Sequence, residues 1–394
     1  MGVRLTQAAP ILFGTGSLAE LGNQLKMRGS GKVMIITDKG VTGAGVTAKV
    51  ENVIKDAGIG CAVFDGCLSD APSDSVTSAV KAIKEANADV IVALGGGSCM
   101  DTAKASALLI KADKPITDFI GKPPGGAVVP AGPDIPVITI PTTSGTGSEV
   151  TVVAIISDSA TSVKSGIFCE GAYLAIVDPE LTVDLPPQIT AMTGMDVVAH
   201  AVEAICGVQR NPMSDLRGYE ALRLVNAYLY DAVENGSNIA AREGMSMASS
   251  LAGLAFSDSI TSLAHSVSQS LAAVIHLHHG LLCGLATPPE LEVFASAVPQ
   301  RVRKIGEIFG ADIPADAEPE LIGKIAASRL RAFMSQIGIR SLAQMGFTRE
   351  DIMALTDVAM QDFMKNFSPL PITREVMVGV LESMYNYQGA VSCP

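Results

Sequence analysis

The chain has 394 residues, of which 48% are hydrophobic, 4% aromatic and 17% charged, and its formal net charge is −12. This length exceeds one typical hydrophobic core and predicts two domains of roughly 200 residues each. The negative charge argues against nucleic-acid partners, the lack of ~18 consecutive apolar residues argues against a membrane span, and without an export signal a cytoplasmic chain is expected.

The first half of the chain alternates short β-branched runs with helical segments. The apolar runs cover residues 33–38, 61–66, 90–98, 136–141 and 174–178. Strands that alternate with helices are typical of a parallel sheet with helices on both faces. We therefore predict an α/β domain over residues 1–185, which ends where Pro186 and Pro187 interrupt regular pairing.

A glycine-rich loop ends the third run, directly after its apolar residues Val90 to Leu94. Gly96, Gly97 and Ser98 stand between the apolar residues and a helix that has Asp101 in its first turns. Backbone N–H groups at such a junction can hold a pyrophosphate. The loop lacks the GxGxxG fingerprint, and a glycine-rich turn alone is more often a packing device than a ligand site.

A second small-residue loop follows the next strand and contains Thr142, Thr143 and Thr146. Two such loops favour nucleotide binding over packing, because small residues allow a ligand to approach the backbone closely. Asp38 ends the first run; a carboxylate there can accept from a ribose hydroxyl and repel a 2′-phosphate, so NAD is expected rather than NADP. The alternative interpretation is that Asp38 only forms a turn.

From residue 186 to residue 394 the apolar spacing becomes helical, which predicts an all-helical second domain. All five histidines lie between His200 and His279 in this part of the chain. Asp196 and His200 are four residues apart, so a helix projects both from one face. With His265 and His279 they form a predicted metal site of one carboxylate and three imidazoles, which suits Fe(II), Zn(II) or Mn(II).

The competing interpretation of these four residues needs no metal. Asp196 would cap its helix or form an ion pair, and the histidines would be ordinary, partly buried polar groups with hydrogen-bond partners. Each residue taken alone favours this interpretation. The combination of an Asp/His pair on one helix with a cluster of histidines favours the metal site.

Four motifs, in this order and spacing, are similar to those of the iron-containing alcohol dehydrogenases, the family that includes lactaldehyde reductase and 1,3-propanediol dehydrogenase. They are GGGSCMDTAKA at 95–105, PTTSGTGSEVT at 141–151, GMDVVAHAVEA at 194–204 and HSVSQSLAAVIHLHHG at 265–280. The resemblance covers essentially the whole chain. It implies a Rossmann-like nucleotide-binding domain, a helical metal-binding domain of the kind also found in dehydroquinate synthase, and a homodimer or larger homo-oligomer.

The resemblance also implies roles for individual residues. Asp196, His200, His265 and His279 would hold a divalent metal, usually iron, and Lys164 would reach the cofactor ribose. The other residues expected to contact NAD are Asp38, Gly96, Gly97, Ser98, Asp101, Thr142, Thr143, Thr146 and Leu181.

One departure from the family pattern concerns proton transfer. The family commonly has a second histidine four residues after the third metal ligand, and here that position is Gln269. An amide cannot act as an acid or base near neutral pH, so we expect water, the cofactor ribose or His278 to carry the proton, with His276 on the surface of a helix. Gln269 would instead contact a polar group of the substrate.

The expected reaction interconverts a small primary alcohol and its aldehyde, with a metal polarising the oxygen and NAD exchanging the hydride. Two alternatives remain at this point. One is a metal- and NAD-dependent cyclase that resembles dehydroquinate synthase and consumes no cofactor. The other is a noncatalytic nucleotide-binding relative, in which Gln269 marks the decay of an active site.

Overall fold

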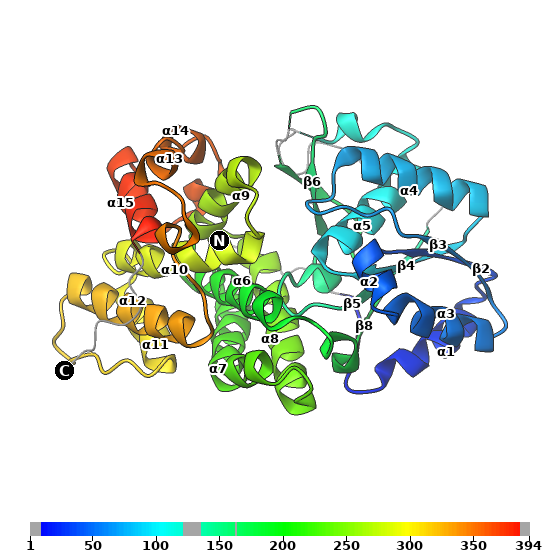
Figure 1. Ribbon diagram of the computed structural model, residues 1–394, viewed down its shortest axis with the longest axis horizontal. Helices are drawn as coiled ribbons and strands as arrows, with labels where there is room; N and C mark the ends of the chain where they lie inside the picture. Colours follow the sequence, from blue (N-terminus) through cyan, green and yellow to red (C-terminus); the bar gives the residue numbers. More distant parts are fainter. Residues whose placement is uncertain (1–8, 121–134, 162–163, 387–394) are drawn as a thin grey trace. The chain divides into compact units, whose positions relative to one another are not determined.

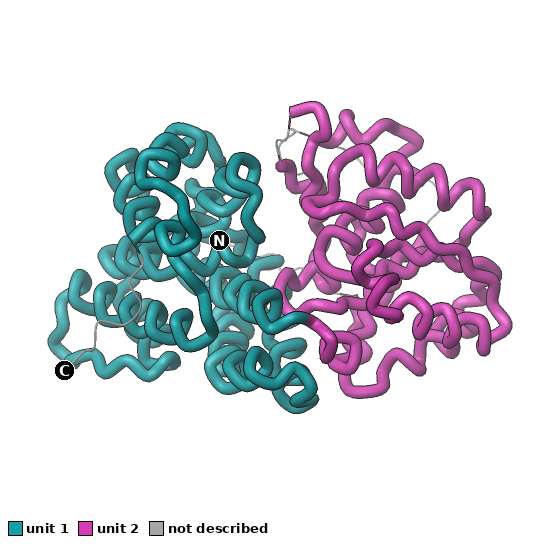
Figure 2. Tube along the Cα trace, in the orientation of Figure 1, with its two compact units in different colours: residues 1–6, 186–394 teal, residues 7–185 magenta. Residues whose placement is uncertain are grey.

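The computed structural model describes residues 9–120, 135–161 and 164–386 (Figure 1). The described residues up to Leu185 form one compact unit, and those from Pro186 onward form a second (Figure 2). The first unit contains a parallel sheet and helices. Among its described residues the second unit contains helices and no strand, so the predicted combination of an α/β part and an all-helical part is confirmed.

Six strands form the main sheet, in the order β1-β8-β5-β4-β2-β3, and every neighbouring pair is parallel. The four inner strands β8, β5, β4 and β2 are buried because both faces of the sheet are covered, whereas the edge strands β1 and β3 are partly exposed. In β2, for example, Val33 and Ile35 join the core on one face while Met34 and Ile36 join the core on the other. The strands are β1 (Ile11–Phe13), β2 (Lys32–Ile36), β3 (Gly60–Phe64), β4 (Val90–Gly95), β5 (Val137–Pro141) and β8 (Leu174–Val177).

Helices pack on both faces of this sheet. Apolar side chains of α1 and α3 contact one face, and those of α4 and α5 contact the other. The helices are α1 (Leu21–Arg28), α2 (Lys39–Gly43), α3 (Val46–Asp56), α4 (Ser73–Ala86) and α5 (Gly97–Ala112), with the 3₁₀ turns η1 (Ser17–Glu20), η2 (Ile116–Asp118), η3 (Ser148–Val150) and η4 (Pro179–Thr182).

Two features of this unit were not predicted. The short strand β1 extends the sheet beside β8, and an antiparallel hairpin joins β6 (Val153–Ser157) to β7 (Lys164–Phe168). Burial alternates along β6, as expected of a strand with one covered face.

The order of the strands defines where a ligand would bind. The chain passes from β2 outward to β3 and then returns to β4 on the other side of β2. Ligands of open α/β sheets bind at the carboxyl ends of the strands where the order reverses in this way. Here that point lies between β2, which is followed by Asp38, and β4, which is followed by the loop of Gly96 and Gly97.

The helical unit is built around one apolar helix, α6, which contacts α7, α8, α9 and α10. This helix is long and apolar enough to cross a membrane, but 94% of its apolar window is buried inside the structure, so it is a core helix. The helices are α6 (Pro187–Cys206), α7 (Pro212–Glu234), α8 (Ile239–Ser259), α9 (Leu263–Ile275), α10 (His279–Phe294), α11 (Pro299–Ile308), α12 (Pro319–Gln336), α13 (Arg349–Met353), α14 (Thr356–Ala359) and α15 (Arg374–Tyr385), with the 3₁₀ turns η5 (Ala343–Met345) and η6 (Met364–Phe367).

Two glycines bring α10 against α6. A Cβ atom on Gly280 would lie 2.4 Å from the carbonyl oxygen of Met192, and one on Gly284 would lie 2.7 Å from the Cβ of Met195. Both distances are shorter than any van der Waals contact, so only glycine permits this approach. The approach places the first turn of α10 beside Asp196, the central acidic residue of α6.

Candidate functional site

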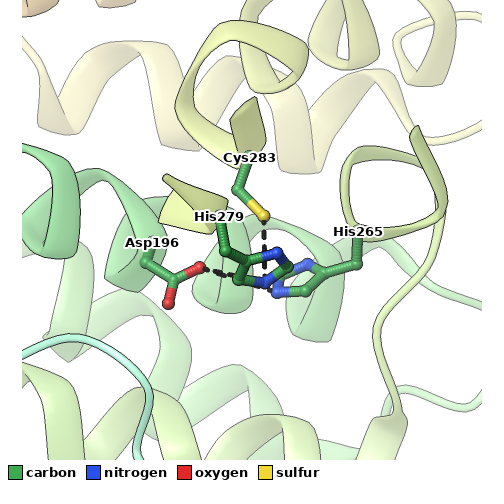
Figure 3. Close-up of side chains that lie close together, drawn as sticks. All are labelled: Asp196, His265, His279 and Cys283. Carbon is green, nitrogen blue, oxygen red and sulfur yellow. Dashed lines mark hydrogen bonds and ion pairs between the residues drawn. The ribbon is translucent and has the colours of Figure 1, made fainter. Parts of the chain in front are cut away.

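Four potential metal ligands converge inside the helical unit. Asp196 comes from α6, His265 from α9, and His279 and Cys283 from α10, and their ligand atoms all lie within 4.8 Å of one another (Figure 3). Asp196 Oδ1 lies 3.7 Å from His265 Nε2 and 3.8 Å from His279 Nε2. Three of the four residues predicted as metal ligands are therefore brought together by three different helices.

The donor atoms of this cluster fit a divalent cation. Asp196 Oδ1 and His265 Nε2 are buried and have no hydrogen-bond partner among the described residues. Such atoms cost stability when nothing satisfies them. Metal–ligand distances of about 2.0–2.3 Å in a tetrahedral site separate neighbouring ligand atoms by roughly 3.3–3.8 Å. Asp196 Oδ1 already stands at that spacing from the Nε2 atoms of both His265 and His279.

The opposite nitrogen of each imidazole is held by another side chain. Nδ1 of His265 forms a hydrogen bond with a carboxylate oxygen of Glu203. Nδ1 of His279 lies 2.9 Å from Oγ of Ser268, whose hydroxyl donates to the His279 carbonyl at 3.0 Å. With a proton on Nδ1, each ring presents the Nε2 lone pair to the cluster, which is how metal-binding histidines are normally held.

His200 lies beside the cluster without joining it. It is one turn from Asp196 on α6, as predicted, and its ring stacks on those of His265 and Phe256 at centroid distances of 4.5 and 4.3 Å. Its ring nitrogens are not among the converging ligand atoms. The structure supports its predicted proximity to the other ligands, and its role as a ligand stays a prediction.

Cys283 is the residue of the cluster that the sequence analysis missed. It lies one turn after His279 on α10, and its Sγ is 3.5 Å from His279 Nε2. Burial raises the pKa of this thiol to about 11, and His265 opposes the shift. The available signal was the spacing of four residues from His279, the same spacing that pointed to Asp196 and His200.

The electrostatics of His265 have opposing causes. Burial lowers the pKa of its imidazole, but the neighbouring Cys283 and the Glu203 carboxylate raise it, and the net pKa lies well above the ordinary histidine value. Without a metal ion, the protonated and positively charged form of His265 is thus favoured beside Cys283 and Glu203. A divalent cation at the same position would supply that charge in place of the proton.

The residues expected to transfer protons or contact substrate lie around the first turns of α10 and the second turn of α9. Gln269 follows His265 by one turn on α9 and is partly buried, whereas His278 is exposed at the N-cap of α10. His276 is exposed, as expected of a surface residue, but it does not lie within a helix. It is the C-cap of α9, with a φ of 51°, because the chain turns there to begin a new helix at His279.

The two loops predicted to bind a nucleotide contact each other at the carboxyl ends of β4 and β5. Thr142 N–H donates to the Gly95 carbonyl at 3.0 Å, and a Cβ on Gly97 would lie 2.9 Å from the side chain of Thr146. Gly96 is the N-cap of α5 and Gly97 begins that helix. The helix N-terminus presents backbone N–H groups beside the sheet's switch point, an arrangement that suits a phosphate.

Asp101 links the glycine-rich loop and α5 to neighbouring parts of the same unit. Its Oδ1 accepts from Ser148 at 2.6 Å and lies 3.1 Å from the Lys104 ammonium, and its Oδ2 accepts from Ile155 N–H at 3.0 Å. Lys104 is itself buried and also donates to the Ser148 hydroxyl. These contacts fix α5 to the second loop and to β6, whereas a cofactor contact by Asp101 stays a prediction.

Three other predicted cofactor residues have defined surroundings. Asp38 caps α2 by accepting from Val41 N–H at 2.9 Å, and its other oxygen accepts from the Cys99 thiol at 3.2 Å. Lys164 pairs with Asp70 at 2.6 Å. The Asp70 N–H donates to Ser98 at 3.1 Å, so this pair is attached to the glycine-rich loop.

Of the remaining predicted cofactor residues, Thr143 stands beside the glycine-rich loop, with its hydroxyl 3.5 Å from the position of a Cβ on Gly96. Leu181 lies in the 3₁₀ turn η4 and is buried in the core on the α1 and α3 face of the sheet. Its environment is therefore apolar packing, and a cofactor contact by Leu181 stays a prediction.

Comparison with known proteins gives matches over most of the chain. Residues 8–179 match the family model described as iron-containing alcohol dehydrogenase, and residues 190–385 match that of the C-terminal part of the Fe-containing alcohol dehydrogenase family. The chain is 34% identical over 376 residues to the NAD-dependent methanol dehydrogenase of Bacillus methanolicus, a match that covers 94% of this chain and 97% of the relative.

Solved structures give the same result. The structure of a 1,3-propanediol oxidoreductase matches with a TM-score of 0.90 and 26% identity, over 98% of this chain and all of that one. The sulfoacetaldehyde reductase of Bifidobacterium kashiwanohense, solved in complex with NAD+, matches with a TM-score of 0.87 and 29% identity, over 98% of this chain and 99% of that one. The chain therefore belongs to the iron-containing alcohol dehydrogenase family and is an enzyme of that family.

Proposed function

We propose that this enzyme interconverts a small primary alcohol and its aldehyde, with NAD as the redox partner and one divalent cation in the helical unit. The observation that carries the proposal is the convergence of Asp196, His265 and His279, with two buried donor atoms that no described residue satisfies. We further propose that it works in the cytoplasm as a homodimer or larger homo-oligomer.

The cation would be held by Asp196, His265 and His279, with Cys283 and His200 within reach of the same cluster. When bound, it would supply Lewis-acid polarisation of the substrate oxygen. Carboxylate and imidazole donors suit Fe(II), Zn(II) and Mn(II), and the neighbouring thiol favours the first two over Mn(II). Fe(II) is the first choice because the chain belongs to an iron-containing family.

The cofactor would be held by the two loops at the switch point of the sheet. The N–H groups at Gly97 and Ser98, at the start of α5, would bind its phosphates, and Thr142, Thr143 and Thr146 line the same edge of the sheet. Asp38 would accept from a ribose hydroxyl and repel a 2′-phosphate, which favours NAD over NADP. The NAD-dependent methanol dehydrogenase and the NAD+-bound reductase among the similar proteins support this choice.

Gln269 would shape the substrate pocket without moving protons. Its amide offers both a donor and an acceptor and does not ionise near neutral pH. The side chain is partly buried one turn after His265, where it would contact a polar group next to the reacting carbon. A small aldehyde with a polar or anionic substituent is therefore the substrate class we propose, and a similar protein is named for sulfoacetaldehyde.

The exposed His278 at the start of α10 would relay the proton between solvent and substrate, because an imidazole ionises near neutral pH. Its place beside the metal-binding His279 makes it the ionisable side chain we assign to this task. Water and the cofactor ribose would serve as further carriers.

The proposal is tested by anaerobic reconstitution with Fe(II), and separately with Zn(II), followed by NADH absorbance against a panel of small alcohols and aldehydes. We expect metal-dependent turnover that is lost in His265→Ala and retained in Gly379→Ala, a substitution on the exposed side of α15. Substrate conversion without any net change in NADH would favour a cyclase. NAD binding without turnover under any metal would favour a noncatalytic protein.

A further inference from the structure

Two buried glutamates meet at the N-terminus of α9, and the mechanism above uses neither. Glu203 lies on α6 and Glu290 on α10, and both are fully buried. Glu290 Oε1 accepts from Ala264 N–H at 3.1 Å, and Glu203 Oε1 accepts from His265 N–H at 3.1 Å. Two carboxyl groups from neighbouring helices thus accept from two of the free N–H groups in the first turn of α9, where the helix dipole favours negative charge.

Only one of the two glutamates also contacts the imidazole of His265. Oε2 of Glu203 forms the hydrogen bond with His265 Nδ1, whereas Oε2 of Glu290 has no hydrogen-bond partner among the described residues. Ser262 Oγ lies between the pair, at 3.5 Å from Glu203 Oε1 and 3.4 Å from Glu290 Oε1. The two side chains are therefore matched in burial and in helix capping, and differ in the contact with the ring.

We propose that Glu203 is the positioning residue of the metal site, and that it holds His265 in the tautomer whose Nε2 faces Asp196. This inference rests on the proposed metal site. Glu203 holds His265 by the backbone N–H and by Nδ1 together, so the ring cannot rotate without losing a hydrogen bond. With the proton kept on Nδ1, the lone pair stays on Nε2, 3.7 Å from Asp196 Oδ1.

The pKa of Glu290 agrees with a positioning role for Glu203 and a helix-capping role for Glu290. Burial, together with the adjacent negative charge of Glu203, holds the pKa of Glu290 well above the ordinary carboxyl range. The raised pKa favours the neutral form of this carboxyl group, which makes no hydrogen bond with the ring of His265. A carboxylate at Glu203, which does contact the ring, makes the imidazole a stronger donor to a cation and fixes its orientation.

Glu203→Gln is the decisive substitution because an amide cannot satisfy both donors of His265. If its oxygen faces the backbone N–H, its NH₂ group faces Nδ1 and forces the ring proton onto Nε2, which then cannot bind a cation. If its oxygen faces Nδ1, its NH₂ group meets the backbone N–H, and one buried donor is lost. Glu290→Gln keeps an acceptor for Ala264 N–H and leaves both contacts between Glu203 and His265 in place.

The experiment measures Zn(II) affinity of the full-length protein by competition with a chromophoric chelator, in wild type, Glu203→Gln, Glu290→Gln and His265→Ala. Loss of such an outer contact typically weakens binding by 10- to 100-fold. We expect about this loss in Glu203→Gln and less than about threefold in Glu290→Gln. Equal losses in both glutamine variants would mean that capping of α9 is the whole role of Glu203, and would overturn the proposal.

Selective ¹⁵N labelling of the five histidines gives a readout that does not depend on the overall stability of the variant. In the Zn(II)-bound wild type the His265 signals, assigned by their loss in His265→Ala, should show a proton on Nδ1 and a metal-coordinated Nε2. A proton on Nε2 in the wild type would overturn the proposal. Absence of Zn(II) binding by the wild type itself would instead refute the proposed metal site.

Discussion

Replacing Gly280 by alanine places a methyl group where α10 meets α6. The new Cβ would lie 2.4 Å from the Met192 carbonyl oxygen and 3.0 Å from the Cβ of Asp196. An ordinary carbon–oxygen contact requires the two helices to separate by about 1 Å. Overpacking of this kind costs about 1–3 kcal/mol of the free energy of unfolding. The displacement also moves His279, the residue before Gly280, away from Asp196.

The same substitution should weaken metal binding. Metal–ligand distances tolerate deviations of roughly 0.2 Å, so a shift of about 1 Å removes His279 as a ligand and should weaken Zn(II) binding at least tenfold, or about 1.4 kcal/mol. Urea unfolding of the metal-free protein measures the first effect, and chelator competition measures the second. The matched control is Gly379→Ala, a substitution of the same kind away from the metal site. A Cβ at this exposed position in α15 meets nothing within 4 Å, so alanine should stabilise the helix by about 0.5–1 kcal/mol. Wild-type Zn(II) affinity and stability in Gly280→Ala would refute the reasoning.

Three further predictions concern the cofactor, the pH dependence of stability and the proton path. Asp38→Asn keeps the cap of α2 but removes the charge, and should raise kcat/KM for NADPH relative to NADH by roughly tenfold; an unchanged ratio in steady-state assays would contradict the assignment of Asp38. Burial raises the pKa of the Cys169 thiol from 9.0 to about 12. The thiol of the unfolded chain ionises at a lower pH, so the contribution of Cys169 to the free energy of unfolding is complete below pH ~9 and is lost as the pH rises toward 12, by at most about 1.4 kcal/mol per pH unit. In urea unfolding measured between these pH values, Cys169→Ala should therefore lose less stability than the wild type. Equal losses in the two proteins would show that the thiol does not ionise on unfolding. Gln269→His should add a second ionisation, near the ordinary histidine pKa of about 6.5, to the pH profile of kcat that His278 gives the wild type, and a profile identical to that of the wild type would place residue 269 away from the reacting groups.

The parallel sheet could be predicted because its strands carry a strong local signal. The runs that became β2, β4 and β5 are rich in Val and Ile because both of their faces are buried. The missed elements lack such a signal. Strand β1 has three residues between Pro10 and Gly14, and β6 and β7 are half-exposed strands held by pairing with each other.

The metal cluster was predictable only where the ligands share a helix or belong to a rare residue type. The spacing of Asp196 and His200 and the clustering of histidines indicated the site. Cys283 was missed because the seven cysteines are scattered and none stands in a CxxC pair. Gly280 lies between His279 and Cys283 in α10. A glycine is required there by the approach of α10 to α6, a tertiary contact that no local pattern encodes.

Glu203 and Ser268 illustrate a similar limit. In sequence they are ordinary polar residues on helices, and their contacts with the imidazoles of His265 and His279 depend on which helices face each other. The sequence predicts which residues offer donor atoms to a cation. The packing of α6, α9 and α10 decides which residues orient those atoms.

The most direct test of the account is the metal content of the purified protein after anaerobic equilibration with Fe(II) or Zn(II) and removal of unbound ions. Elemental analysis should give one divalent ion per chain in the wild type and almost none in Asp196→Ala or His265→Ala, with Gly379→Ala unchanged. A wild-type protein that retains no ion, or an Asp196→Ala variant that retains a full equivalent, would contradict the claim that these side chains form the metal centre.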